Sequence, residues 1–228
     1  PGETVTVQIT KKKSSFVEGY VTEVLKGSDQ RITPKDPDSY LSTSPWQIMD
    51  FATEGHYKSA LIEEAFELHD IVLPQPITVW TDDIEFEYRN KIEYSFWYDT
   101  DAKQLDLAFF RRSTHGKITI DHTSLAAPII TEVSKTILQA LRTLKIDGRS
   151  LKTVIIRSNR VGQTAWQLYV KDDTIDAQAL LDTATHSSTI CAEVIYSNPK
   201  SPASVITKRL AKYGEQVLTD TILDIPFS

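Results

Sequence analysis

The most constraining feature of the sequence is the stretch IEFEYRNKIEYSF, residues 84–96, in which apolar and polar side chains alternate. Its apolar members, continued two residues further, fall on even positions: Phe86, Tyr88, Ile92, Tyr94, Phe96 and Tyr98. Successive side chains of a β-strand point to opposite faces, so the alternation predicts a strand with one packed face and one face in water. Asn90 interrupts the apolar face, and we expect a bulge or kink there.

The polar face of this strand allows two interpretations. In the first, Arg89, Asn90 and Lys91 at its centre contact a ligand. In the second, the basic residues only form a surface ladder of cross-strand pairs with acidic residues such as Glu87 and Glu93, and Asn90 lies near a strand end. Both interpretations stay open at the level of this stretch alone.

The rest of the chain predicts a mixture of strands and helices. We expect a β-ribbon within residues 3–27, a linker at 28–45, a helix within 46–68, a hairpin of 104–112 with 117–121, a helix at 126–144, an antiparallel pair of 151–158 with 165–171, a short helix at 174–185, a buried strand at 189–197 and a helix at 202–213. Gly55 makes a break in the first helix plausible. The fold class is therefore α+β, with a mostly antiparallel sheet and helices packed on one side.

Composition excludes several classes of protein. With 228 residues, 40% of them apolar, the chain can bury a sizeable core in one or two domains. No apolar run approaches the roughly 18 residues that a membrane span needs, and the start does not resemble a signal segment. The single cysteine excludes an intrachain disulfide and a cysteine-held cluster within this chain. The net charge of −6 leaves a local basic face possible.

A search for self-contained chemistry is largely negative. The eight glycines are at least eight positions apart, which excludes a glycine-rich phosphate loop, and neither a zinc-protease motif nor a nucleophile elbow occurs. Asp121 beside His122 suggests an acid–base pair for a small-molecule hydrolase, although neighbours on a strand point to opposite faces. Cys191 lies in an apolar strand, which favours a small buried side chain over a nucleophile.

Three segments in the same order resemble the RNA uracil carbon-5 methyltransferase family. They are YRNKIEYSF, LAFFRRSTHGKITIDHTSLA and VIYSNPKSPASVITKRLAKYGEQVLTDTILDIPFS. Residues 1–34 also resemble the second half of the TRAM domain, and PWQIMDF resembles the entry to the family's central domain. The resemblance implies a partial TRAM (OB-like) β segment at 1–33 and a central α+β RNA-recognition domain at 34–228, which ends at the junction to an absent methyltransferase domain.

Some members of that family hold an iron–sulfur cluster with four cysteines, and this sequence departs from their pattern. Asp36 stands where such members have a cysteine before proline, Ser44 or a neighbour stands ahead of the Trp-Gln pair, and Thr123 follows Asp-His. We therefore expect no iron–sulfur cluster here. We expect packing and hydrogen bonds to hold the same region instead.

The family's catalytic parts follow the point where this sequence stops. These parts are the S-adenosylmethionine fold with its cofactor loop, the cysteine that adds to uracil carbon 6, and the general base. The resemblance thus implies S-adenosylmethionine for the parent enzyme only, with no catalytic, cofactor-binding or metal-binding residue in this chain, and an inactive fragment. Cys191 should not be given the nucleophile's role.

What remains for this chain is RNA recognition. A bent strand and the neighbouring hairpin can grip phosphates while the missing domain receives a flipped-out uracil. The candidate RNA-binding residues are Lys11, Lys12, Lys13, Arg89, Asn90, Lys91, Arg111, Arg112, His115, Lys117 and Lys200. The lysine run and Lys200 have alternative roles, as a solvated turn and in shaping a crossover.

We therefore expect the RNA-binding portion of a cytoplasmic RNA uracil carbon-5 methyltransferase that acts on ribosomal or transfer RNA, as a monomer and without a membrane. The alternative is a non-catalytic RNA-binding or protein-interaction module. A hydrolase that uses Asp121 and His122 is the third hypothesis, and it requires both side chains to converge on one pocket.

Overall fold

The computed structural model describes residues 2–112, 114, 116–214 and 217–227. The chain divides into two compact units, Pro1–Pro37 with Pro45–Thr81 and Asp38–Ser44 with Asp82–Ser228. The assignment of residues 1–33 to a TRAM domain stays a prediction.

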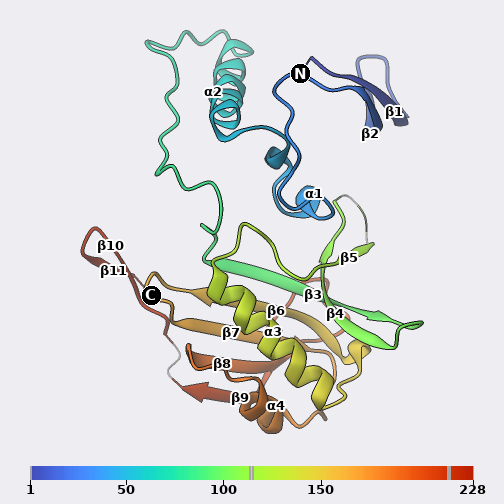
Figure 1. Ribbon diagram of the computed structural model, residues 1–228, viewed down its shortest axis with the longest axis vertical. Helices are drawn as coiled ribbons and strands as arrows, with labels where there is room; N and C mark the ends of the chain where they lie inside the picture. The colour runs from blue at the N-terminus through green and yellow to red at the C-terminus, as the bar shows by residue number, and fades with distance from the viewer. Residues whose placement is uncertain (1, 113, 115, 215–216, 228) are drawn as a thin grey trace. The chain divides into compact units, whose positions relative to one another are not determined.

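The first unit consists of a ribbon and a helix (Figure 1). Strand β1 (Thr4–Lys12) pairs antiparallel with β2 (Val17–Lys26), as predicted. After the 3-10 turn η1 (Pro45–Ile48), helix α2 (Phe51–Glu67) begins where the Asp50 side chain accepts a hydrogen bond of 2.7 Å from the Thr53 amide. The helix is unbroken at Gly55. No described side chain of α2 is buried, so this unit holds its helix without an apolar core.

The second unit is built on a seven-stranded sheet. Its spatial order is β5-β4-β3-β6-β7-β8-β9, antiparallel throughout except for the parallel pair β7–β8. The strands are β3 (Lys91–Asp99), β4 (Gln104–Phe110), β5 (Lys117–Thr119), β6 (Leu151–Ser158), β7 (Thr164–Val170), β8 (Thr189–Tyr196) and β9 (Lys208–Gly214). A small hairpin of β10 (Asp220–Ile222) and β11 (Ile225–Phe227) follows. The predicted α+β class with a mostly antiparallel sheet is confirmed.

Helices cover one face of this sheet. Helix α3 (Pro128–Thr143) and helix α4 (Ala177–Ala184) lie on the same side of the strands (Figure 1), while α1 (Tyr40–Thr43) and η2 (Gly148–Ser150) are single turns. Alternate residues of the strands face the helices and form the core. Two cross-strand rows of that face are Ile92, Ile156, Trp166 and Ala192, and Tyr94, Val154, Leu168 and Val194. The remaining, alternate side chains of each strand point to the opposite face of the sheet.

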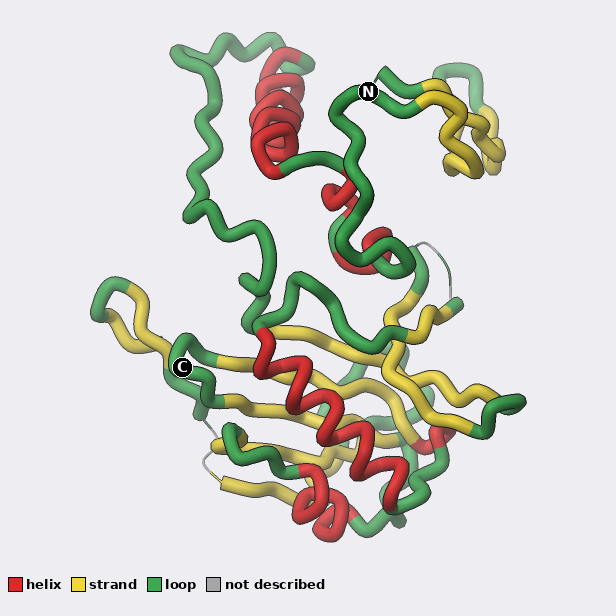
Figure 2. Tube along the Cα trace, in the orientation of Figure 1, coloured by secondary structure: helices red, strands yellow, loops and turns green. Residues whose placement is uncertain are grey.

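The predicted strand at 84–96 is wrong in its first half. Residues 68–90 form an irregular segment (Figure 2), and the sheet begins only at Lys91. Glu87 has φ +60°, a left-handed conformation that ends strand geometry. Arg89 makes a single bridge to Ala126, and the next amide hydrogen bond runs from Ser158 to the Asn90 carbonyl. The predicted kink at Asn90 is thus the start of the strand.

The helix predicted at 202–213 is also wrong, because residues 208–214 form strand β9. This segment pairs antiparallel with β8, from Tyr196–Lys208 to Cys191–Gly214. Apolar residues at 205, 206, 210 and 211 fit either period, and the tertiary pairing decides between them. With β9 in place the edge of β8 is paired, and β9 itself becomes the edge strand of the sheet.

Candidate nucleic-acid interface

The face of the sheet opposite α3 and α4 is the candidate interface. Cross-strand partners share a face, so the register defines its rows. The first row is Lys91, Arg157, Ala165, Cys191 and Gly214, and the second row is Glu93, Ile155, Gln167, Glu193 and Lys212. The first row has basic residues at one end and small residues at the other. The second row is polar along most of its length.

Two exposed cations stand directly opposite each other in the first row. Lys91 on β3 is the register partner of Arg157 on β6. Among the residues that the structure describes, neither side chain makes an ion pair. Like charges placed opposite each other destabilise a sheet. An anion between them would remove that cost, which makes this pair a candidate phosphate contact.

A hydrogen-bonded network fixes the second row. The Gln167 Nε2 donates to Glu193 Oε2 at 2.8 Å, and the Arg209 Nε donates to Glu193 Oε1 at 2.7 Å. The Tyr169 hydroxyl donates to Gln167 Oε1 at 3.3 Å. Burial, and then the nearby Glu193 carboxylate, raise the pKa of Tyr169. The network is therefore a preorganised polar strip with the Arg209 charge already compensated.

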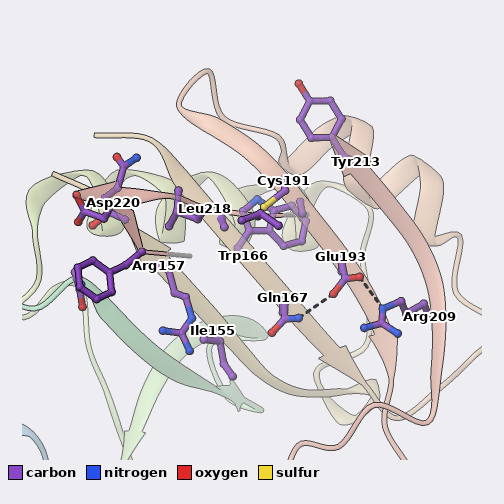
Figure 3. Close-up of a pocket in the computed structure, with 17 residues that line it drawn as sticks. Ile155, Arg157, Trp166, Gln167, Cys191, Glu193, Arg209, Tyr213, Leu218 and Asp220 are labelled. Atoms are coloured by element: carbon purple, nitrogen blue, oxygen red, sulfur yellow. Dashed lines mark hydrogen bonds and ion pairs between the residues drawn. The ribbon is translucent and has the colours of Figure 1, made fainter. Parts of the chain in front are cut away.

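A groove of about 660 Å³ lies on this face (Figure 3). The small side chains Ala165 and Cys191 form its floor, because larger residues flank them in the neighbouring row. The Gln167–Glu193 strip lines one side. Val217 and Leu218, which follow β9, line the other side.

Two local features hold the wall of the groove in place. The Asn159 Nδ2 donates to the Thr219 carbonyl at 2.9 Å, which fixes the segment after β9. Gly214 has φ +67°, and a Cβ there would lie 2.0 Å from the Ile190 carbonyl oxygen. Only glycine permits this close approach of β9 to β8.

The loop that connects β8 to β9 is held by the side chain of Lys152. The Lys152 ammonium lies near three carbonyl oxygens of the β8–β9 connection, at 2.6 Å from Ala203, 3.0 Å from Ser201 and 3.4 Å from Asn198. Burial lowers the pKa of Lys152, and the nearby Lys171 lowers it further. This arrangement supports the crossover role for the loop that carries Lys200.

The predicted site residues divide into held and exposed groups. The Arg89 Nη2 donates to the Thr43 carbonyl at 3.1 Å, so Arg89 anchors residues 38–44. The Lys117 ammonium donates to the Phe96 carbonyl at 2.8 Å, and burial lowers its pKa. Asn90 and Lys91 are exposed, and Asn90 also lines the groove. Lys200 is exposed, and its amide bonds Asn198 Oδ1 at 2.9 Å.

The two basic stretches do not pair. The β3–β4 ladder ends at Ser95–Ala108, after which β4 turns to β5 (Figure 1). Arg111 and Arg112 are exposed at that turn, with the Arg111 Nε donating to the Lys117 carbonyl at 3.3 Å. His115 lies outside the described residues. Asp106, the acidic residue of the adjoining strand β4, pairs with Arg142 of α3.

In the first unit, the lysine run lies at the tip of the ribbon. Lys11 is 3.6 Å from the Glu18 carboxylate, and the Lys13 ammonium lies 5.2 Å from the centre of the Phe16 ring. Lys12 is the register partner of Val17 and is exposed. These contacts fit a solvated turn and leave the Lys12 charge available.

Arg157 is the functional candidate that sequence reasoning missed. It is the one charged residue after the apolar run of LKTVIIRS, a position that is normally assigned to a strand end. Its significance comes from its register partner Lys91, which no local pattern indicates. The run before it, residues 154–156, is continuously apolar, so no alternation of charged and apolar residues places Arg157 on the water-facing side.

The remaining sequence hypotheses concern chemistry. Asp121 and His122 lie in a turn, not a strand, and their side chains approach to 3.8 Å, but both are largely exposed and Asp121 pairs with Lys135. Asp36 is buried and bonded to Gln47, its amide donating to Gln47 Oε1 at 3.0 Å, as expected for a region held by hydrogen bonds. Thr123, at the other position that departs from the cysteine pattern, is buried as well.

The described residues are compatible with neither a metal cluster nor a membrane-spanning helix, as follows from two features. Within residues 2–112, 114, 116–214 and 217–227, no group of three or more His, Cys, Asp or Glu side chains could hold a metal ion. None of the helices in the described part of the chain is both long enough and apolar enough to cross a membrane.

Comparison with known proteins gives a consistent group of relatives, although no protein-family profile matches the chain. An uncharacterized RNA methyltransferase of Halalkalibacterium halodurans is 25% identical over all of this chain and 52% of its own length. The 23S rRNA (uracil(1939)-C(5))-methyltransferase RlmD of Vibrio cholerae is 27% identical over 56% of this chain and 29% of its own length.

A solved structure shows the same fold. The tRNA (uracil-54, C5)-methyltransferase of Pyrococcus abyssi, in complex with S-adenosyl-L-homocysteine, superposes with a TM-score of 0.73 and 13% identity, over 100% of this chain and 52% of that one. In the comparisons that cover the whole of this chain, the chain spans about half the length of the relative.

Proposed function

We propose that this chain, whose homologues are RNA uracil carbon-5 methyltransferases, is the RNA-binding portion of an S-adenosylmethionine-dependent enzyme of that kind. The RNA is ribosomal or transfer RNA, the location is the cytoplasm and the chain is a monomer. The three segments that resemble the family lie in the second unit, which carries the exposed sheet face.

The Lys91–Arg157 pair is the observation that carries the proposal. RNA-binding surfaces gain most of their affinity from cations that neutralise phosphates. On an acidic protein, a like-charge pair that makes no ion pair among the described residues is otherwise unfavourable, and Glu93, one rung away on the same face, offsets only part of that repulsion. Arg111 and Arg112 supply a second exposed pair at the β4–β5 turn, where an RNA strand could be held at a separate point.

The proposal assigns no residue of this chain to the methyl donor. Its glycines are at least eight positions apart, so it has no glycine-rich cofactor loop. Cys191 is 8% exposed in the middle of a sheet. We therefore assign S-adenosylmethionine binding and the nucleophile to the part of the homologues beyond the matched half, and we derive no chemical step from this chain.

Binding and methyl transfer can be measured separately. We expect the 228-residue chain to bind single-stranded and loop-containing RNA in fluorescence anisotropy, with affinity that falls as salt rises. We expect no transfer of a radiolabelled methyl group from S-adenosylmethionine to that RNA. Lack of any salt-dependent RNA binding would contradict the proposal, and methyl transfer by the purified chain would contradict its catalytic part.

A non-catalytic protein-interaction module is the alternative function. It predicts RNA binding no tighter than that of an unrelated acidic protein at equal salt. The exposed apolar hairpin β10–β11, with Leu223 89% exposed, is the feature that favours it. The same anisotropy experiment therefore separates the two functions.

A further inference from the structure

The groove on the open sheet face has the shape and chemistry of a site for a single flat ring. Its volume of about 660 Å³ falls within the range of small-molecule sites, roughly 300–1,000 Å³. Its floor is made by Ala165 and Cys191, so a planar group can lie against the strands. In the same cross-strand row, Arg157 and Lys91 follow Ala165 on one side, and Gly214 follows Cys191 on the other.

Charge is distributed unevenly along the groove. Arg209 is compensated by Glu193 in the polar strip. Asp220 lies at the rim on the side of the β10–β11 hairpin. Arg157 lines the groove without an ion pair among the described residues, and its register partner Lys91 stands beside it at the border, at one end of the floor. Lys212, the register partner of Glu193, is a single exposed cation at the other border. A phosphate would be favoured most at the Lys91–Arg157 end, where two cations stand together.

The side of the groove supplies hydrogen-bond acceptors. Each oxygen of the Glu193 carboxylate accepts one hydrogen bond in the network, and an ionised carboxylate has about four acceptor sites. The network holds Glu193 in one orientation, so its free acceptor capacity is fixed in space. It can take an N–H group from the edge of a base that lies on the floor.

We propose that this groove binds one unpaired RNA nucleotide, with its phosphate between Lys91 and Arg157, its base on the Ala165–Cys191 floor and an N–H edge toward Glu193. The inference rests on the proposed RNA-binding function and deepens it. A base inside an A-form helix is stacked and cannot reach such a floor, whereas a base in a loop or single strand can be splayed out. The site therefore selects unpaired RNA.

Cys191 is the sole cysteine of the chain, so its rate of alkylation measures how accessible the groove floor is. Iodoacetamide alkylation of Cys191, followed by intact mass, measures its accessibility without introducing a label. We expect a saturating single-stranded 12-nucleotide RNA to slow alkylation about fivefold or more. We expect the same RNA annealed to its complement to leave the rate unchanged.

Substitutions test the floor and the phosphate end separately. Ala165→Leu fills the floor and should weaken single-strand binding about tenfold, with Ala102→Leu, an exposed site in the β3–β4 turn, as the matched control. Arg157→Ala should lower the slope of log affinity against log salt by about 0.7, the value for one phosphate contact on a single strand. Arg149→Ala, at the other end of the same strand region and already paired with Asp147, removes an equal charge and should leave the slope unchanged.

The outcomes separate the two claims. Thermal melts by circular dichroism show whether Ala165→Leu remains folded, and the Cys191 protection experiment needs no variant. If the chain binds RNA but Ala165→Leu binds as the wild type does, or Cys191 alkylates equally with and without RNA, the groove assignment is overturned and the RNA-binding function stands. If the wild-type chain binds no RNA, both are overturned.

Discussion

Replacing Gly214 by alanine tests the tight β8–β9 junction that closes one end of the groove. The left-handed φ of +67° costs an L-residue about 1–2 kcal/mol. The new Cβ would also lie 2.0 Å from the Ile190 carbonyl oxygen, and this backbone atom cannot move without opening the last rung of the ladder. Losing one or two ladder hydrogen bonds adds roughly 1 kcal/mol each, so we expect a total loss of about 3 kcal/mol.

Gly162→Ala is the matched control for this substitution. Gly162 has φ +81°, but a Cβ there would meet nothing within 4 Å, so only the conformational cost of about 1 kcal/mol applies. In thermal melts, a domain of this size loses about 2–4 °C per kcal/mol, which predicts a fall of about 8 °C for Gly214→Ala and about 3 °C for Gly162→Ala. Equal shifts would show that β9 does not approach β8 as closely as described.

Three further perturbations have separate outcomes. Alanine at both Arg111 and Arg112, which are exposed at the β4–β5 turn, should lower the salt slope of single-strand RNA binding by about 1.4, and an unchanged slope would remove this turn from the interface. Lys152→Met leaves carbonyls of the β8–β9 connection without their donor and should cost about 2 kcal/mol in urea unfolding, whereas a neutral effect would mean that water replaces the ammonium. The Glu3 pKa is lowered to about 2 by its hydrogen bond to Arg31. A carboxyl group with a lowered pKa stabilises the fold at pH values above its unfolded-state pKa, and this stabilisation is lost as the pH falls toward the folded-state pKa. Glu3→Gln should therefore remove about 1 kcal/mol of the pH dependence of unfolding free energy between pH 5 and pH 2. An unaltered pH profile would argue against the Glu3–Arg31 pair.

Local pattern predicted most of the sheet correctly because its strands obey the two-residue period on a single packed face. Residues 151–158 and 189–196 form strands where the apolar runs indicated them, and α3 follows its helical stripe. The pattern was misleading at 84–90, since the alternation there continues through Glu87, whose backbone leaves the extended region. Only the tertiary contacts of residues 124–127 determine that outcome.

The candidate site was harder to predict than the fold, because it depends on register. Arg89 and Lys91 look equivalent in sequence, yet Arg89 binds the Thr43 carbonyl while Lys91 faces water opposite Arg157. The groove floor depends on small residues from two strands, Ala165 of β7 and Cys191 of β8, and no single segment contains that information. Residues that act together across strands become visible only when the pairing is known.

The absence of buried apolar side chains from α2 has a consequence for hydrogen exchange. In the described residues, every member of the hydrophobic core belongs to the second unit, from Ile92 to Val194. Most of the stability of a helix in a protein comes from packing an apolar face, and no described side chain of α2 is buried. Amides of α2 should therefore exchange through local opening within seconds to minutes, whereas those of β6 to β8 exchange only through global unfolding. In calorimetry, the heat absorbed in the unfolding transition of this chain would come from the sheet unit, and the ribbon and α2 would add no separate transition.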